Sequence, residues 1–155
     1  MPARKPASQS KKTTILLVEA DVIVRFAIAD YLRTCDLVVV EVGSADEARA
    51  ILVAGPTINV LLSDAQLAGG GSGFVLAQWV RRHRPDIDVV LTASIASKAQ
   101  AAAELAARDP VCRPPSDAAG LLARLNGMLA ERKRRLRQQP RAASAGSARR
   151  KRVSS

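Results

Sequence analysis

Short apolar runs alternate with longer amphipathic segments between about residue 13 and residue 135. Runs made almost wholly of Val, Leu and Ile are typical of strands that helices bury on both faces of a parallel sheet. A weaker run at 111–112 is cut short by Pro114, because proline donates no hydrogen bond within a sheet. The pattern predicts strands at Thr14–Val18, Leu37–Val42, Asn59–Ser63, Asp88–Thr92 and 111–112.

The segments between these runs place apolar residues at the spacing of one helix face, as Ala27, Ile28 and Tyr31 do in the first segment. The second segment opens on Ser44, with Glu47 three residues later, which is the capping-box pattern of a helix start. We therefore predict helices at Asp21–Cys35, from Ser44 to about Gly55, at Phe74–His83, at Ser97–Arg108 and from Ser116 to about Arg135.

Strands that alternate with helices predict an open, doubly wound α/β sheet, because connections between parallel strands are nearly always right-handed crossovers. In such sheets the functional crevice lies at the carboxyl ends of the strands. Four places in the chain meet that condition, and they are Glu19-Ala20-Asp21, Asp64 with the loop after it, Thr92-Ala93, and Cys112-Arg113-Pro114.

The net charge of +10 comes from the two ends of the chain. Residues 1–13 carry +4 and residues 131–155 carry +9, whereas the body between them carries −3. The ends are rich in basic and small polar residues, a composition typical of disorder. We predict a disordered tail at 1–12, one domain at 13–135 and a second disordered tail at 136–155. Such tails are either solvated or bind nucleic acid or an acidic partner weakly and without sequence preference.

Residue content argues against several classes of protein. Cys35 and Cys112 form no CxxC pair and have no histidine cluster near them, which argues against a metal–thiolate site. No apolar segment approaches the roughly 20 residues of a membrane span, so we expect a soluble cytoplasmic protein. His83 is the single histidine and lies in a run of arginines. Because no nucleophile–base pair is evident, we do not expect a metabolic enzyme.

The predicted strand ends resemble the receiver domains of bacterial two-component response regulators, over about residues 13–130. The resemblance implies a flavodoxin-like fold of five parallel strands in the order 2-1-3-4-5 with five helices. Each matching segment stands at its expected place in the order of elements. The segments are Ile15–Asp21 for the first strand and acidic cluster, Leu61–Asp64 for the strand before the phosphoacceptor, Leu67–Phe74 for the loop after it, Val90–Ala93 for the hydroxyl-bearing strand, and Arg113-Pro114 for a Lys-Pro pair.

The resemblance also implies a role for each matched residue. Asp64 would accept a phosphoryl group, and Thr92 and Arg113 would contact the phosphoryl oxygens. Mg²⁺ would be held by Asp64, by Glu19 and by the backbone carbonyl of Gln66. The family needs a metal because the donor and the acceptor carboxylate are both anionic and repel each other.

Three departures from the family pattern weaken this reading. The family's pair of acidic residues falls on Glu19 and Ala20, so the usual direct metal ligand is lost at Ala20. Asp21 follows at once, either as a substitute ligand or as the N-cap of the first helix. Arg113 keeps the charge of the family lysine and changes its geometry. No aromatic residue stands shortly before Arg113, where the family often has one that switches conformation. We therefore expect Mg²⁺ binding to be weakened or absent.

Three functions remain open from the sequence. The first is a single-domain response regulator in a phosphorelay, which accepts a phosphoryl group on Asp64 from a histidine kinase or phosphotransfer protein. The second is a pseudo-receiver that works by protein–protein contact without efficient phosphorylation. The third is a nucleic-acid-associated protein that uses its basic tail. The resemblance further implies a downstream protein target and a homodimer as partners.

Overall fold

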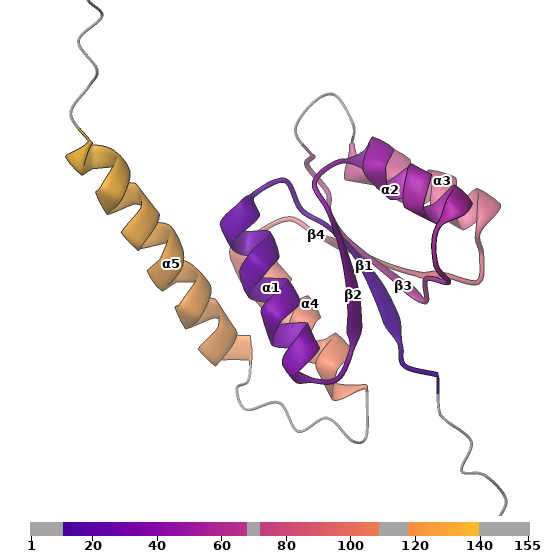
Figure 1. The fold of residues 1–155 in the computed structure, drawn as a ribbon, viewed down its shortest axis with the longest axis horizontal. Helices are drawn as coiled ribbons and strands as arrows, with labels where there is room; N and C mark the ends of the chain where they lie inside the picture. Colours follow the sequence, from indigo (N-terminus) through magenta and orange to yellow (C-terminus); the bar gives the residue numbers. More distant parts are fainter. Residues whose placement is uncertain (1–10, 68–71, 109–117, 140–155) are drawn as a thin grey trace, which may run out of the picture.

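The computed structural model describes residues 11–67, 72–108 and 118–139. Four parallel strands form one sheet in the order β2-β1-β3-β4, and helices lie on both of its faces (Figure 1). The predicted strand order is confirmed for these four strands, whereas the predicted fifth strand at 111–112 lies outside the described residues. The strands are β1 (Thr14–Val18), β2 (Val38–Val42), β3 (Val60–Asp64) and β4 (Asp88–Thr92).

The five predicted helices are present, with ends close to those predicted. Within the described residues, the last helix starts at Ala118 and continues beyond the predicted end at Arg135 to Gln138. Ser44 is confirmed as an N-cap, because its side chain accepts a hydrogen bond from the amide of Glu47. The helices are α1 (Val22–Thr34), α2 (Ala45–Ala54), α3 (Gly73–His83), α4 (Ile95–Ala107) and α5 (Ala118–Gln138).

Alternation along the central strands divides the core into two layers. Leu16 and Leu61 face one layer, where they pack with residues of α2 and α3. Ile15, Leu17 and Leu62 face the other layer, where they pack with α1, α4 and α5. The sheet therefore lies between α2 and α3 on one side and α1 and α4 on the other (Figure 1).

Small residues let α4 lie close to its neighbours. Ala99, Ala102 and Ala106 of α4 are buried, and Leu105 of the same helix is buried with them. Leu121 and Leu125 of α5 complete the same cluster. Ser94 caps the start of α4 through a reciprocal pair of hydrogen bonds with Ser97. Since α4 begins directly after β4, its first turns lie at the carboxyl edge of the sheet.

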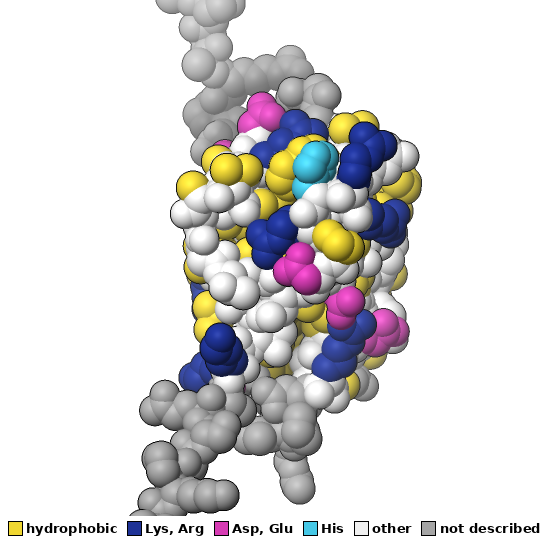
Figure 2. Space-filling view, turned by 90° about the vertical axis from the view of Figure 1, so that its right-hand side faces the viewer, with side chains coloured by type: hydrophobic (Ala, Val, Ile, Leu, Met, Phe, Trp, Pro, Cys, Tyr) yellow, Lys and Arg dark blue, Asp and Glu magenta, His cyan; other side chains and the backbone are white. Residues whose placement is uncertain are grey.

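The face over α2 and α3 carries basic, acidic and apolar side chains interspersed (Figure 2). His83 is the last residue of α3 and is exposed. Its ring stacks on Trp79 with centroids 4.7 Å apart, and its Nδ1 lies 2.9 Å from the carbonyl of Trp79. Within the described part of the chain, no helix is both long and apolar enough to cross a membrane.

Gly73, the first residue of α3, lies tightly against the end of β3. A Cβ atom on this residue would stand 1.9 Å from the carbonyl oxygen of Asp64, which is far inside contact distance. We expect Gly73→Ala to lower the free energy of unfolding by about 1–3 kcal/mol through overpacking. Urea unfolding followed by circular dichroism measures this change.

Gly127 provides the matched control within α5. A Cβ atom there would meet nothing within 4 Å, so Gly127→Ala should raise the free energy of unfolding by roughly 0.5–1 kcal/mol through helix propensity. A Gly73→Ala protein as stable as the wild type would contradict the close approach at Asp64.

Candidate functional site

Three of the predicted site residues meet at the carboxyl edge of the sheet. Glu19 directly follows β1, Asp64 ends β3 and Thr92 ends β4. The pairing register places Asp64 beside Thr92 on neighbouring strands. The structure thus brings Glu19, Asp64 and Thr92 together, because parallel strands end at the same edge.

Glu19 is a buried carboxylate, with 5% of its side chain exposed. Its Oε1 accepts a hydrogen bond from the amide of Asp21 at 3.0 Å. Its own carbonyl accepts a bond from the Arg25 guanidinium at 2.7 Å, which ties the strand end to α1. A carboxylate with so little water around it needs a cation close by, because the burial of an unpaired charge is costly.

Asp64 is more accessible, with 15% of its side chain exposed. Its Oδ1 accepts a hydrogen bond from the amide of Gln66 at 2.9 Å, which fixes the orientation of the carboxylate. Thr92 is buried, and its hydroxyl lies 3.4 Å from the carbonyl oxygen of Ser63. The site therefore combines an oriented, partly exposed carboxylate with a hydroxyl on the adjacent strand.

The cation of this site is Lys98, a residue of α4 that sequence reasoning did not select. Its Nζ lies 2.6 Å from Glu19 Oε2 and 2.9 Å from Asp64 Oδ2. The lysine side chain is 9% exposed. Burial lowers the pKa of Lys98, but the hydrogen bonds and charges of Glu19 and Asp64 outweigh burial and hold the pKa above its ordinary value. Lys98 is therefore an ammonium ion that bridges two carboxylates.

A signal for Lys98 exists in the sequence. Lys98, Ala101, Ala102 and Leu105 fall at the spacing of one helix face, and all four are buried. A single lysine on the buried face of an alanine-rich helix is unusual, since lysine is almost never fully buried unless it is paired. The same lysine lies near the N-terminus of α4, where the helix dipole disfavours a positive charge. Both features indicate that Lys98 has an acidic partner.

Asp21 serves as the N-cap of α1, one of the two roles left open by the sequence. Its side chain accepts hydrogen bonds from the amides of Ile23 and Val24. It also receives two hydrogen bonds from the Arg132 guanidinium, at 2.9 and 2.8 Å. Burial raises the pKa of Asp21, but the bonds from Arg132 and from the two amides outweigh burial and lower the pKa below its ordinary value. Asp21 is thereby fully engaged between α1 and α5.

The described residues do not form a metal-binding cluster. Among them, no group of three or more His, Cys, Asp or Glu side chains could hold a metal ion. Glu19 Oε2 and Asp64 Oδ2, the oxygens that a shared cation would contact, are already held by Lys98. The pocket at this point leaves about 10 Å³, roughly the space of one water molecule. The predicted Mg²⁺ ligand set of Glu19, Asp64 and the Gln66 carbonyl therefore does not fit a metal in this arrangement.

Two further predicted positions stand apart from this cluster. Ala20, the position of the lost metal ligand, is exposed between β1 and α1. Arg113, the predicted phosphoryl contact, lies outside the described residues.

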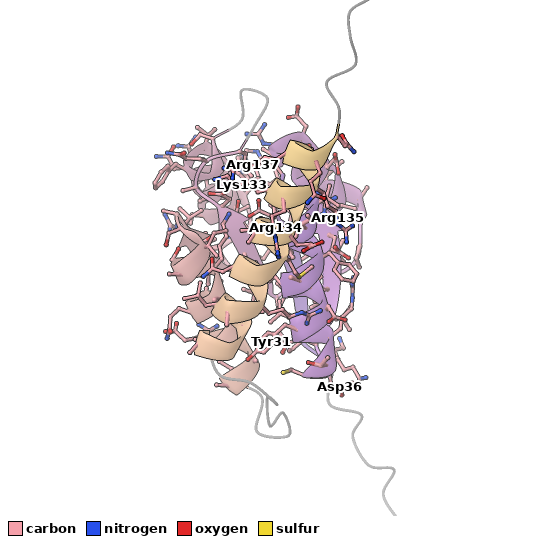
Figure 3. The ribbon with its side chains drawn as sticks, turned by 90° about the vertical axis from the view of Figure 1, so that its left-hand side faces the viewer. Tyr31, Asp36, Lys133, Arg134, Arg135 and Arg137 are labelled. Atoms are coloured by element: carbon pink, nitrogen blue, oxygen red, sulfur yellow. The ribbon has the colours of Figure 1, made fainter. Side chains whose placement is uncertain are left out.

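The basic end of α5 lies at the same edge of the domain as Asp21. Figure 3 shows Lys133, Arg134, Arg135 and Arg137 together on the last turns of this helix. Glu131 pairs with Arg134 at 3.0 Å and with Arg135 at 3.1 Å. Part of the positive charge that the sequence places here is thus neutralised within the helix itself.

The family model and the solved structures that match this chain point to the same fold. Residues 15–126 match the family model described as the response regulator receiver domain. No curated protein matches the chain. The family match extends from Ile15 in β1 to Asn126 in α5.

Solved structures show the same fold at low sequence identity. A response regulator receiver protein from Pseudomonas putida is 22% identical, with 54% of this chain and 69% of that chain covered and a TM-score of 0.51. A response regulator receiver domain protein from Clostridium thermocellum is 19% identical, with 78% and 97% covered and a TM-score of 0.50. The Salmonella typhimurium response regulator RcsB is 19% identical, with 81% and 61% covered and a TM-score of 0.51.

The capping role of Asp21 generates a stability prediction. Asp21→Ala removes a side-chain N-cap and should lower the free energy of unfolding by about 0.5–2 kcal/mol. Asp21→Asn retains the capping oxygen and loses the charge, so it should fall between the wild type and the alanine variant. Urea unfolding near neutral pH measures both changes.

The advantage of the wild type over Asp21→Asn should depend on pH. The pKa of Asp21 is lower in the folded protein than its ordinary value, so the stabilisation is complete above the ordinary value and is lost as the pH falls through the lowered one. Equal stability of wild type and Asp21→Asn at neutral pH would show that the pair with Arg132 contributes nothing.

Proposed function

The chain belongs to the response-regulator receiver family, and from that premise we propose that it takes a phosphoryl group on Asp64 as a receiver in a two-component phosphorelay. The observation that carries the proposal is the placement of Asp64. It ends the central strand β3, is partly exposed, and has its carboxylate oriented by the amide of Gln66. A histidine kinase or a phosphotransfer protein would supply the phosphoryl group.

The proposed reaction is a transfer to one Asp64 carboxylate oxygen. That oxygen forms a bond to phosphorus, the bond from phosphorus to the donor atom breaks, and the donor leaves with the electron pair of that bond. The product is a mixed anhydride between Asp64 and phosphate. Thr92 ends the adjacent strand, where its hydroxyl would donate to a phosphoryl oxygen after leaving the Ser63 carbonyl.

Lys98 links the charge at Asp64 to the helices that would carry the signal. The phosphoryl group is dianionic where the carboxylate was monoanionic, so phosphorylation adds negative charge on the Asp64 side of the ammonium. The ammonium then shifts its contacts from Glu19 toward the phosphoryl group, and α4 moves with it. Because α4 packs on α1 and α5, these helices form the output surface of the proposed mechanism.

The pseudo-receiver is the second candidate, and the closed site favours it. Lys98 already satisfies both acidic side chains, and the pocket leaves space on the order of one water molecule. In this alternative the Glu19–Lys98–Asp64 contacts are permanent and structural, and the module acts only through its surface. Phosphorylation of Asp64 is the measurement that separates the two candidates.

The test uses acetyl phosphate as donor and intact mass as readout, with Mg²⁺ present. We expect the wild type to gain one phosphoryl group and Asp64→Asn to gain none, because an uncharged carboxamide does not attack phosphorus as a carboxylate does. Asp46→Asn is the matched control, since the Asp46 side chain belongs to α2 and is 95% exposed.

Two outcomes would contradict the proposal. No mass gain in the wild type, with either acetyl phosphate or a phosphorylated phosphotransfer protein as donor, would favour the pseudo-receiver. A gain that survives in Asp64→Asn would place the modification on another residue.

A further inference from the structure

Lys98 occupies the position between Glu19 and Asp64 that a divalent cation would need. We propose that Lys98 is the resident cation of the acceptor site, so that Asp64 accepts a phosphoryl group from an acyl phosphate without Mg²⁺. This inference rests on the proposed function of Asp64 and goes beyond it, because it assigns the source of positive charge to a side chain of α4.

The hydrogen bonds of the two carboxylates support the assignment. Each of their four oxygens has a donor among the described residues. Backbone amides of Asp21 and Gln66 donate to Glu19 Oε1 and Asp64 Oδ1, at 3.0 and 2.9 Å. Lys98 donates to the two remaining oxygens, at 2.6 and 2.9 Å. Each oxygen of the two carboxylates therefore has a hydrogen-bond donor without coordination to a metal ion.

The charge and the burial of the Lys98 ammonium allow it to offset the negative charge of the two carboxylates. Glu19 and Asp64 carry two negative charges, and Lys98 is within hydrogen-bond distance of both, in a site with little water. Coulombic attraction is stronger in such a site than in bulk water. The same ammonium repels a second cation, so Lys98 both reduces the repulsion that an anionic donor meets and excludes Mg²⁺.

The ammonium has a donor left for the reacting group. A lysine ammonium carries three N–H donors, and the contacts with Glu19 and Asp64 use two of them. Among the described residues no further acceptor contacts Lys98 Nζ, and in the proposed mechanism the third N–H donates to an oxygen of the incoming phosphoryl group. Preorganised donors of this kind stabilise charge as it develops in the transition state.

The step balances with acetyl phosphate as the donor. One Asp64 oxygen bonds to phosphorus, the bond between phosphorus and the acetyl oxygen breaks, and acetate leaves with that electron pair. Acetate is stable as an anion at neutral pH, so no proton has to be supplied and no general acid is required.

The first experiment measures phosphorylation of the wild type by intact mass in EDTA and in millimolar Mg²⁺. We expect equal rates in the two conditions. Lys98→Met should slow the reaction in EDTA by roughly 100-fold, the scale seen when one preorganised donor is removed. Lys12→Met is the matched control, because it removes a lysine from an exposed ion pair with Asp36, and it should react like the wild type.

The outcomes of this experiment separate the two proposals. A wild type that reacts only with Mg²⁺ would overturn the role of Lys98 and leave Asp64 as the phosphoacceptor. A wild type that reacts in neither condition would overturn both. A Lys98→Met protein that reacts in EDTA as fast as the wild type would overturn the role of Lys98 alone.

Loss of Lys98 leaves the buried Glu19 carboxylate unpaired and could prevent folding, so a second variant is needed. Lys98→Met combined with Glu19→Gln removes both the ammonium and its buried partner, and circular dichroism checks its fold. It should also lose the reaction in EDTA, and a rate equal to that of the wild type would overturn the proposal.

A magnesium titration tests the exclusion of metal without any phosphorylation. The amide NMR signals of Asp21 and Gln66 report on the two carboxylates, since both amides donate to them. In the wild type we expect no shift at millimolar Mg²⁺. Saturable shifts of these signals in the wild type would show that a metal enters the site and would overturn the proposal.

Discussion

Two carboxylates that lie side by side with little water repel each other, and the parallel sheet forces this arrangement on Glu19 and Asp64. The strands β1 and β3 are neighbours that end at the same edge, so Glu19, which follows β1, and Asp64, which ends β3, lie close together. The Lys98 ammonium resolves the conflict, with one hydrogen bond to each carboxylate. Removing it would leave a buried charge uncompensated, which costs far more than an exposed ion pair contributes.

The position of α4 follows from the same contact. The helix starts at the carboxyl edge, directly after β4, and packs on the layer that holds α1 and α5. Its buried alanines allow the backbone to approach the sheet closely enough for a lysine side chain to reach both carboxylates. Leucines at these positions would hold α4 farther away. The contact of Lys98 with both carboxylates therefore depends on the small residues of the buried face of α4 as well as on the length of the lysine side chain.

The sequence predicts the framework better than it predicts the site. Apolar runs and helix spacing place four strands and five helices, and the carboxyl-end rule selects Glu19, Asp64 and Thr92 from the residue pattern alone. Lys98 was not predicted as a site residue because the rule considers strand ends, whereas Lys98 belongs to the helix α4. Asp21 shows the same limit: its capping role follows from local sequence, but its partner Arg132 is 111 residues away. Contacts between distant elements depend on packing that local patterns do not encode.

The absence of a carboxylate at Ala20 and the presence of the Lys98 ammonium are consistent with each other in the net charge of the site. In the resembled family, an acidic pair and the acceptor aspartate together carry three negative charges around a divalent ion. In this chain position 20 is an alanine without a carboxylate, and the Asp21 carboxylate is bonded to Arg132. Glu19 and Asp64 are therefore the two carboxylates that remain at the site. Two carboxylates with one ammonium carry the same net charge as three carboxylates with one divalent ion. An ammonium held by α4 cannot be removed by a chelator, nor can it depend on the metal concentration of the surroundings. Under the proposed role of Lys98, the site therefore uses a covalently attached cation in place of a diffusible one, and α4, which carries this cation, would respond to the charge that Asp64 acquires.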